Sequence, residues 1–75
     1  MIKTEYLNAA INRALNALRS KQVKANQDAR DALRASLSSL NEARRLFNTG
    51  DADGAYWTVV SAHAHLHTAR RALAS

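Results

Sequence analysis

The 75-residue sequence has no cysteine, no proline and only two glycines, Gly50 and Gly54. A chain without cysteine has neither disulfides nor thiolate metal ligands. No apolar run approaches the roughly 18 residues of a membrane-spanning helix. The start, residues 1–5, is too polar for a secretory signal. We therefore expect a cytoplasmic protein that does not enter a membrane.

Large apolar side chains are also scarce. Leu, Ile, Val and Phe number only 15, whereas alanine alone contributes 16 residues. This content lies at the lower edge for a self-sufficient core. It favours a thin helical bundle completed by self-association over a thick sandwich or barrel.

Catalytic motifs are missing as well. The sequence has no Gly-rich phosphate loop, no Ser-His-Asp arrangement and no pair of carboxylates on one helix face. Its six acidic residues are thinly spread. We expect a protein that is not an enzyme, with no cofactor and no small-molecule substrate.

What the chain does contain is helix-forming sequence almost throughout, in segments of about 4–22, 26–48 and 52–74. The clearest interruption is the stretch 48–54. Gly50 can adopt the left-handed conformation that closes a helix, and Asp51 or Asp53 can cap the next one. A turn this short predicts that the flanking helices run antiparallel.

The last segment carries a heptad seam with large residues at one core position and alanine at the other. Alanine allows helices to approach closely, so this seam predicts a tight hairpin. Its members are Ala52, Val59, Leu66 and Leu73, interleaved with Ala55, Ala62 and Ala69.

The relation between the first two segments stays open. Their apolar stripes are in phase, which favours one continuous helix of about 44 residues. However, Arg19, Lys21 and Lys24 suit a helix end, and the residues Asn26, Asp28 and Asp31 suit a helix start. We predict a break or bend near Lys21–Asn26, with a long bent helix that dimerises into a four-helix arrangement as the alternative.

The predicted fold is therefore one all-α domain, residues 1–75. It is a small bundle of three helical segments that ends in an antiparallel hairpin, and we expect it to be a homodimer.

Trp57 lies opposite the seam of the last segment, beside small residues and an arginine. A lone exposed tryptophan is typical of an interface anchor, although it could instead cover the thin core or pack on the first helix. The leading hypothesis is a small helical interaction protein that binds a larger protein partner and regulates or inhibits it, as regulators on phages and other mobile elements do. The predicted partner-binding residues are Tyr56, Trp57, Arg44, Arg45 and Arg71.

A second hypothesis is a nucleic-acid-binding helical dimer. The net charge of +5 attracts polyanions. However, acidic residues interrupt the basic ones, and no aromatic residue is interleaved to stack on bases. A solvated charged surface is the structural alternative. The residues that would contact phosphates are Arg13, Lys21, Lys24, Arg30 and Arg34.

A third hypothesis is a metal site on the last helix. His63 and His67 lie one helical turn apart on one face, whereas His65 points away. Glu42 is the one carboxylate of the neighbouring segment that we can propose as a further ligand. The alternative is that these histidines flank the seam as amphipathic packing residues.

The spacing of Asp51-Ala52-Asp53, nine residues and His63-x-His65 resembles the Rop family of helical hairpins. The resemblance implies an antiparallel dimeric four-helix bundle that binds RNA hairpins through its first helices. In that register Ala35 stands where the family has an RNA-contacting phenylalanine, so we transfer no site residue and treat the spacing as a convergent hairpin pattern.

Overall fold

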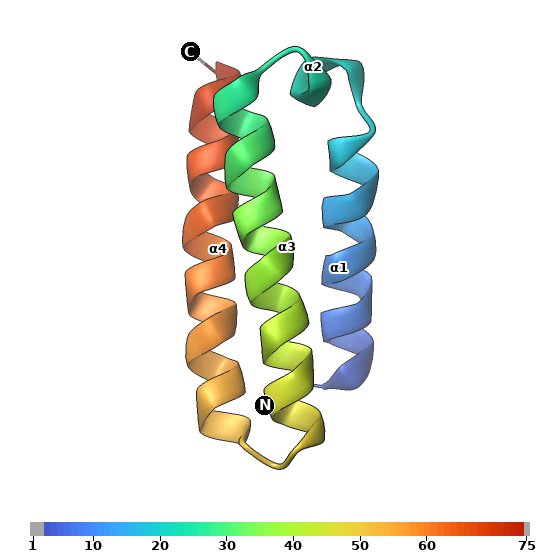
Figure 1. Cartoon of the computed structure of the whole chain (residues 1–75), viewed down its shortest axis with the longest axis vertical. Helices are drawn as coiled ribbons and strands as arrows, with labels where there is room; N and C mark the ends of the chain where they lie inside the picture. Colours follow the sequence, from blue (N-terminus) through green and yellow to red (C-terminus); the bar gives the residue numbers. More distant parts are fainter. Residues whose placement is uncertain (1–2, 75) are drawn as a thin grey trace.

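The computed structural model describes residues 3–74, in which helix is the only regular secondary structure. The four helices are α1 (Thr4–Leu18), α2 (Lys21–Lys24), α3 (Gln27–Asn48) and α4 (Ala52–Ala74). The long helices α1 and α4 run in the same direction, and α3 runs antiparallel to both (Figure 1). The predicted all-α bundle that ends in an antiparallel hairpin is confirmed.

The predicted break between the first two segments is confirmed, and it is made by side-chain caps. Ser20 caps α2, because its Oγ accepts a hydrogen bond from the Val23 amide at 3.2 Å. Asn26 caps α3 by accepting from the Ala29 amide at 3.0 Å, and its Nδ2 donates to the Ala72 carbonyl of α4 at 3.1 Å. The alternative prediction of one continuous helix through this region is therefore wrong.

The turn between α3 and α4 follows the predicted chemistry. Gly50 has a φ of 92°, in the left-handed region that favours glycine. The amide of Asp51 donates to the Leu46 carbonyl at 2.9 Å, and that of Gly50 donates to the Phe47 carbonyl at 3.2 Å, which is the Schellman helix ending. Of the two predicted caps it is Asp51 that accepts from the Gly54 amide, at 2.8 Å.

The core is a stack of three small layers along a molecule of 38 × 17 × 15 Å. Each layer takes buried residues from α3, from α4 and from either α1 or α2. The layer beside the α3–α4 turn holds Leu7, Ala43, Ala55 and Val59; the middle layer holds Ile11, Ala14, Leu40 and Ala62; the layer beside α2 holds Val23, Ala32, Leu33 and Ala69.

The prediction of the heptad seam in α4 is confirmed at the centre of the helix and is wrong at its two ends. The three interleaved alanines and Val59 are buried, and Leu66 is half-buried. Ala52 is exposed because it is the first residue of the helix, next to the turn. Leu73 is 39 % exposed, because it lies at the last turn of α4 beside a partly open hollow.

The three long helices are not equally close to one another. α3 packs against both α1 and α4, whereas direct contact between α1 and α4 is slight. Side chains of α1 and α4 nevertheless share two of the core layers with α3. In the range 3–74, no helix has the length and apolar character needed to cross a membrane. Met1 and Ile2, part of the polar start in the sequence prediction, lie outside the described residues.

Candidate partner-binding site

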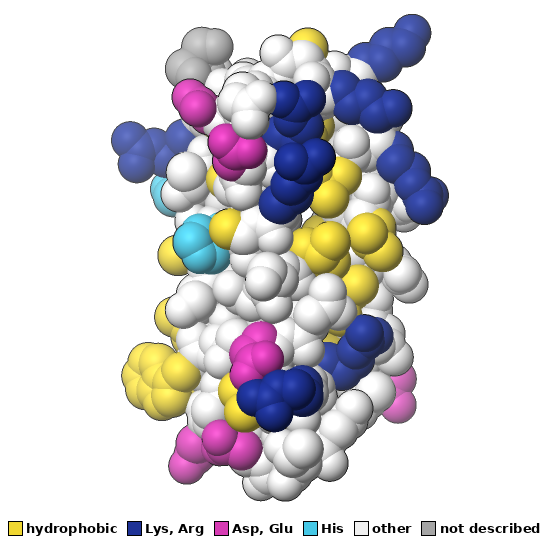
Figure 2. All heavy atoms as spheres, in the orientation of Figure 1, with side chains coloured by type: hydrophobic (Ala, Val, Ile, Leu, Met, Phe, Trp, Pro, Cys, Tyr) yellow, Lys and Arg dark blue, Asp and Glu magenta, His cyan; other side chains and the backbone are white. Residues whose placement is uncertain are grey.

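The first half of α4 presents an exposed apolar surface, which we call the α4 aromatic patch: Tyr56, Trp57 and Val60. Trp57 is 66 % exposed and Tyr56 is 53 % exposed. Their rings meet edge to face, with centroids 5.3 Å apart and planes at 79°. Hydrophobic side chains protrude on the α4 side of Figure 2, in the half away from α2.

The helical period explains why this patch faces solvent. Ala55 and Val59 are buried against the core, which fixes the rotation of α4. At 100° per residue, Tyr56 and Trp57 then turn progressively away from α3. Trp57 thus neither covers the core nor packs on α1, and a rigid helix holds it in place.

The arginines of the predicted partner-binding set lie elsewhere. Arg44 reaches α1, where its Nη1 donates to Asn8 Oδ1 at 3.2 Å. Arg45 forms an exposed ion pair with Glu42 on α3. Arg71 lies 14 residues beyond Trp57, about 21 Å along the helix axis. Only Tyr56 and Trp57 of the predicted five residues therefore form one surface.

Val60 is the residue of the patch that the sequence prediction omits. It is 43 % exposed and lies one turn after Tyr56. The spacing of four residues is the signal that would identify it, because residues i and i+4 share a helix face.

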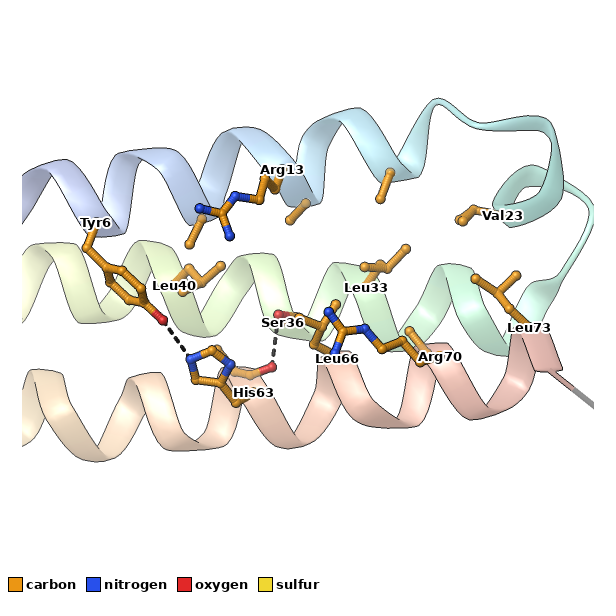
Figure 3. Close-up of a pocket in the computed structure, with 15 residues that line it drawn as sticks. Tyr6, Arg13, Val23, Leu33, Ser36, Leu40, His63, Leu66, Arg70 and Leu73 are labelled. Carbon is orange, nitrogen blue, oxygen red and sulfur yellow. Dashed lines mark hydrogen bonds between the residues drawn. The ribbon is translucent and has the colours of Figure 1, made fainter.

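A second surface lies between α1 and α4, and we call it the α1–α4 groove. It is a partly open hollow of about 310 Å³. Leu33, Ser36 and Leu40 of α3 form its floor, and α1 and α4 form its walls (Figure 3). At one end Tyr6 Oη and His63 Nε2 share a hydrogen bond of 2.7 Å that bridges the two walls.

The polar rim of this groove is basic. Arg13 of α1 and Arg70 of α4 both line it, from opposite walls (Figure 3). No acidic side chain of the described residues lines it. Neither arginine has an ion-pair partner in the range 3–74, where the one ion pair joins Arg45 and Glu42.

The histidines do not come together with other metal ligands. His63 bonds to Tyr6, and His67 is exposed. Glu42 pairs with Arg45 instead. Within the part of the chain that the structure describes, no three His, Cys, Asp or Glu side chains are grouped to hold a metal ion.

The basic residues are less dispersed than the sequence suggests. The end of α1, α2, the start of α3 and the end of α4 meet at one end of the bundle, where most dark-blue side chains lie in Figure 2. Asp28 and Asp31 are the acidic residues of that half. The basic residues in it are Arg13, Arg19, Lys21, Lys24, Arg30, Arg34, Arg70 and Arg71.

All five predicted phosphate-contacting residues belong to this basic half. They do not share one face, however. Arg13 lines the α1–α4 groove and Arg34 lines a shallow hollow on α3. Arg30 is held by the Lys24 carbonyl, to which its Nη1 donates at 3.0 Å.

The chain matches no protein-family model, no curated protein and no solved structure. The features of the molecule that indicate a function are the two surfaces of α4 and the distribution of charge.

Proposed function

We propose that the protein is a small non-enzymatic interaction protein that binds a protein partner through the α4 aromatic patch and regulates or inhibits that partner. The observation that carries this proposal is the exposure of Trp57, at 66 %. Tryptophan and tyrosine are the side chains most enriched at the energetic centres of protein interfaces.

The energetics favour binding at this position. Burying a large apolar side chain contributes about 1.5–3 kcal/mol. Within the chain Trp57 gains little of this, because most of its surface faces solvent. The helix backbone beneath it is already ordered, so a partner that covers the ring bears a small entropic cost.

The test is capture of the partner from native lysate by the intact protein, with Trp57→Ala and Leu15→Ala compared in parallel. Leu15 is 38 % exposed on α1 and serves as the matched apolar control. We expect nuclease-resistant capture of a protein by the wild type and by Leu15→Ala, and loss of at least tenfold with Trp57→Ala. Equal capture by both variants would refute the role of the patch.

The expected homodimer is part of the same proposal, because a thin alanine-rich core gains from self-association. Sedimentation of the purified protein over a hundredfold concentration range tests it. The single tryptophan of the chain is a direct probe, since its emission shifts to the blue if dimerisation buries it. A monomer at every concentration would leave a foreign partner as the occupant of the patch.

Nucleic-acid binding is the second candidate, and the basic half of the bundle favours it. Contacts to phosphates release counterions, so the affinity would fall steeply with salt. The test is a gel shift with duplex DNA, hairpin RNA and single strands at about 50 mM salt. No complex under these conditions would exclude this candidate.

A further inference from the structure

We propose that the α1–α4 groove binds an amphipathic helix of a partner protein that carries an apolar stripe flanked by acidic residues. The groove lies between α1 and α4, with α3 as its floor (Figure 3). A helix seated on it would contact both α1 and α4, as a fourth helix does in a four-helix bundle.

The length of the groove matches a helix of about three turns. On the α4 wall the lining extends from Ala62 to Leu73, about 16 Å along the helix axis. The floor is apolar, and Leu33 and Leu40 are buried there beneath the open side. A helix that lies along this wall would present about three apolar side chains at i, i+4 and i+7.

A small molecule suits the site less well. The hollow of about 310 Å³ is partly open to solvent along the bundle. Sites for small ligands enclose most of the ligand surface. An open trough between two parallel helices instead leaves room for the outer face of a helix to remain in solvent.

Charge determines which helix fits. Arg13 and Arg70 face each other across the groove, and no described acidic side chain lines it. Acidic residues on both flanks of the incoming stripe would pair with them at the rim, where charge complementarity selects the partner and its register.

A second copy of the chain does not supply such a helix. α1 carries one acidic and one basic residue. α3 carries three acidic and four basic residues, and α4 carries one acidic and two basic residues. No long helix of the described chain is therefore net acidic, and none supplies the acidic flanks that the two arginines would select. The occupant is thus a foreign acidic helix.

The experiment uses the intact protein and two synthetic 18-residue helical peptides. Both have the same leucine stripe, but one has glutamate flanks and the other has lysine flanks. Binding is measured by fluorescence anisotropy of labelled peptide, and the site is mapped by amide chemical shifts. We expect the glutamate peptide to bind at least tenfold more tightly and to shift amides on both groove walls.

Two neighbouring variants provide the control. Arg70→Glu and Arg71→Glu change the net charge equally near the same helix end, but only Arg70 lines the groove. We expect Arg70→Glu to lower the affinity for the glutamate peptide at least tenfold and to raise the affinity for the lysine peptide. Arg71→Glu should alter either affinity by less than about threefold, because Arg71 does not line the groove and solvent and salt screen its exposed charge.

The proposal is overturned if both variants lower the affinity for the glutamate peptide equally. That result would indicate that the net positive charge attracts any polyanion. It is also overturned if a single-stranded oligonucleotide displaces the peptide and depends on Arg70 in the same way, or if the shifts map to the α4 aromatic patch. Trp57→Ala leaves the groove intact, so it should retain the peptide. Failure of the groove is thereby distinguished from failure of the proposed function.

Discussion

Ser36 lies in the middle of the bundle and is the buried polar residue of the described chain, at 2 % exposure. Its Oγ donates to the Ala62 carbonyl of α4 at 3.0 Å. A helical carbonyl can accept this second hydrogen bond, because it has two lone pairs. The serine thus links α3 to α4 without leaving a polar atom unpaired.

Replacing Ser36 with alanine tests this link. We expect Ser36→Ala to lower the free energy of unfolding by about 0.5–1.5 kcal/mol, the usual net value of an intramolecular hydrogen bond. Urea denaturation followed by circular dichroism measures it. Ser38→Ala, at an exposed position of α3, is the control and should leave stability almost unchanged. No difference between the two variants would contradict the assigned role.

The ion pair of Glu42 and Arg45 contributes little to the stability of the fold. The hydrogen bond from Arg45 lowers the pKa of Glu42 below 4.5, and the carboxylate raises the pKa of Arg45 in turn. Both side chains are exposed, so solvent and salt screen the pair.

The sign of its pH dependence follows from the lowered pKa of Glu42. The ion pair contributes to the stability of the fold above the pKa that Glu42 has in the unfolded chain. This contribution is lost as the pH falls through the lower pKa that Glu42 has in the folded protein. We expect Glu42→Gln to reduce the urea midpoint slightly at neutral pH, and the difference to vanish well below pH 4.5. A difference that grows in acid would show that Glu42 acts by another mechanism.

At the scale of elements, the joint between α1 and α3 shows what sequence patterns reveal and what they omit. The charge distribution and Asn26 predicted the break, and Asn26 is the cap of α3, whereas the cap of α2, Ser20, was not predicted. Asn26 also donates to the Ala72 carbonyl of α4, and such a tertiary contact leaves no local pattern.

This joint predicts the result of removing both caps. Without them the stretch between α1 and α3 holds only residues compatible with helix. We expect Ser20→Ala/Asn26→Ala to populate a dimer in which one helix of about 45 residues, about 67 Å long, exchanges α1 between chains. Sedimentation and small-angle scattering would detect a particle longer than the 38 Å of the present fold.

The control for this prediction is Asn16→Ala/Ser38→Ala, which changes the same residue types at exposed positions that cap no helix. It should behave as the wild type. A double-cap variant that keeps the compact shape would show that α2 and its contacts suffice to hold the break.

Close packing of α3 and α4 depends on small side chains at the interface. Ala62 is 2 % exposed in the middle layer. We expect Ala62→Leu to lower the free energy of unfolding by about 1–3 kcal/mol, because the larger side chain forces the helices apart. Ala64→Leu, on the exposed side of the same helix, should be tolerated. Thermal unfolding of the two variants compares them directly.

At the scale of the whole molecule, the two surfaces of α4 differ in how far sequence reveals them. The helical period places Trp57 opposite the seam of α4, and its exposure then requires only that no other helix covers that face. The α1–α4 groove needs the positions of all four helices, because each contributes lining residues. The basic half likewise arises only when antiparallel packing brings distant segments to one end.

The α1–α4 groove has a consequence for engineering. α4 ends at the same end of the bundle as α2 (Figure 1), so a helix joined to it through a short linker would run back along the groove. Tethering an acidic helix there makes its docking intramolecular, with an effective concentration on the order of millimolar. Such a fusion would convert an open three-helix protein into a closed four-helix one, and its melting temperature would rise with the fit of the graft.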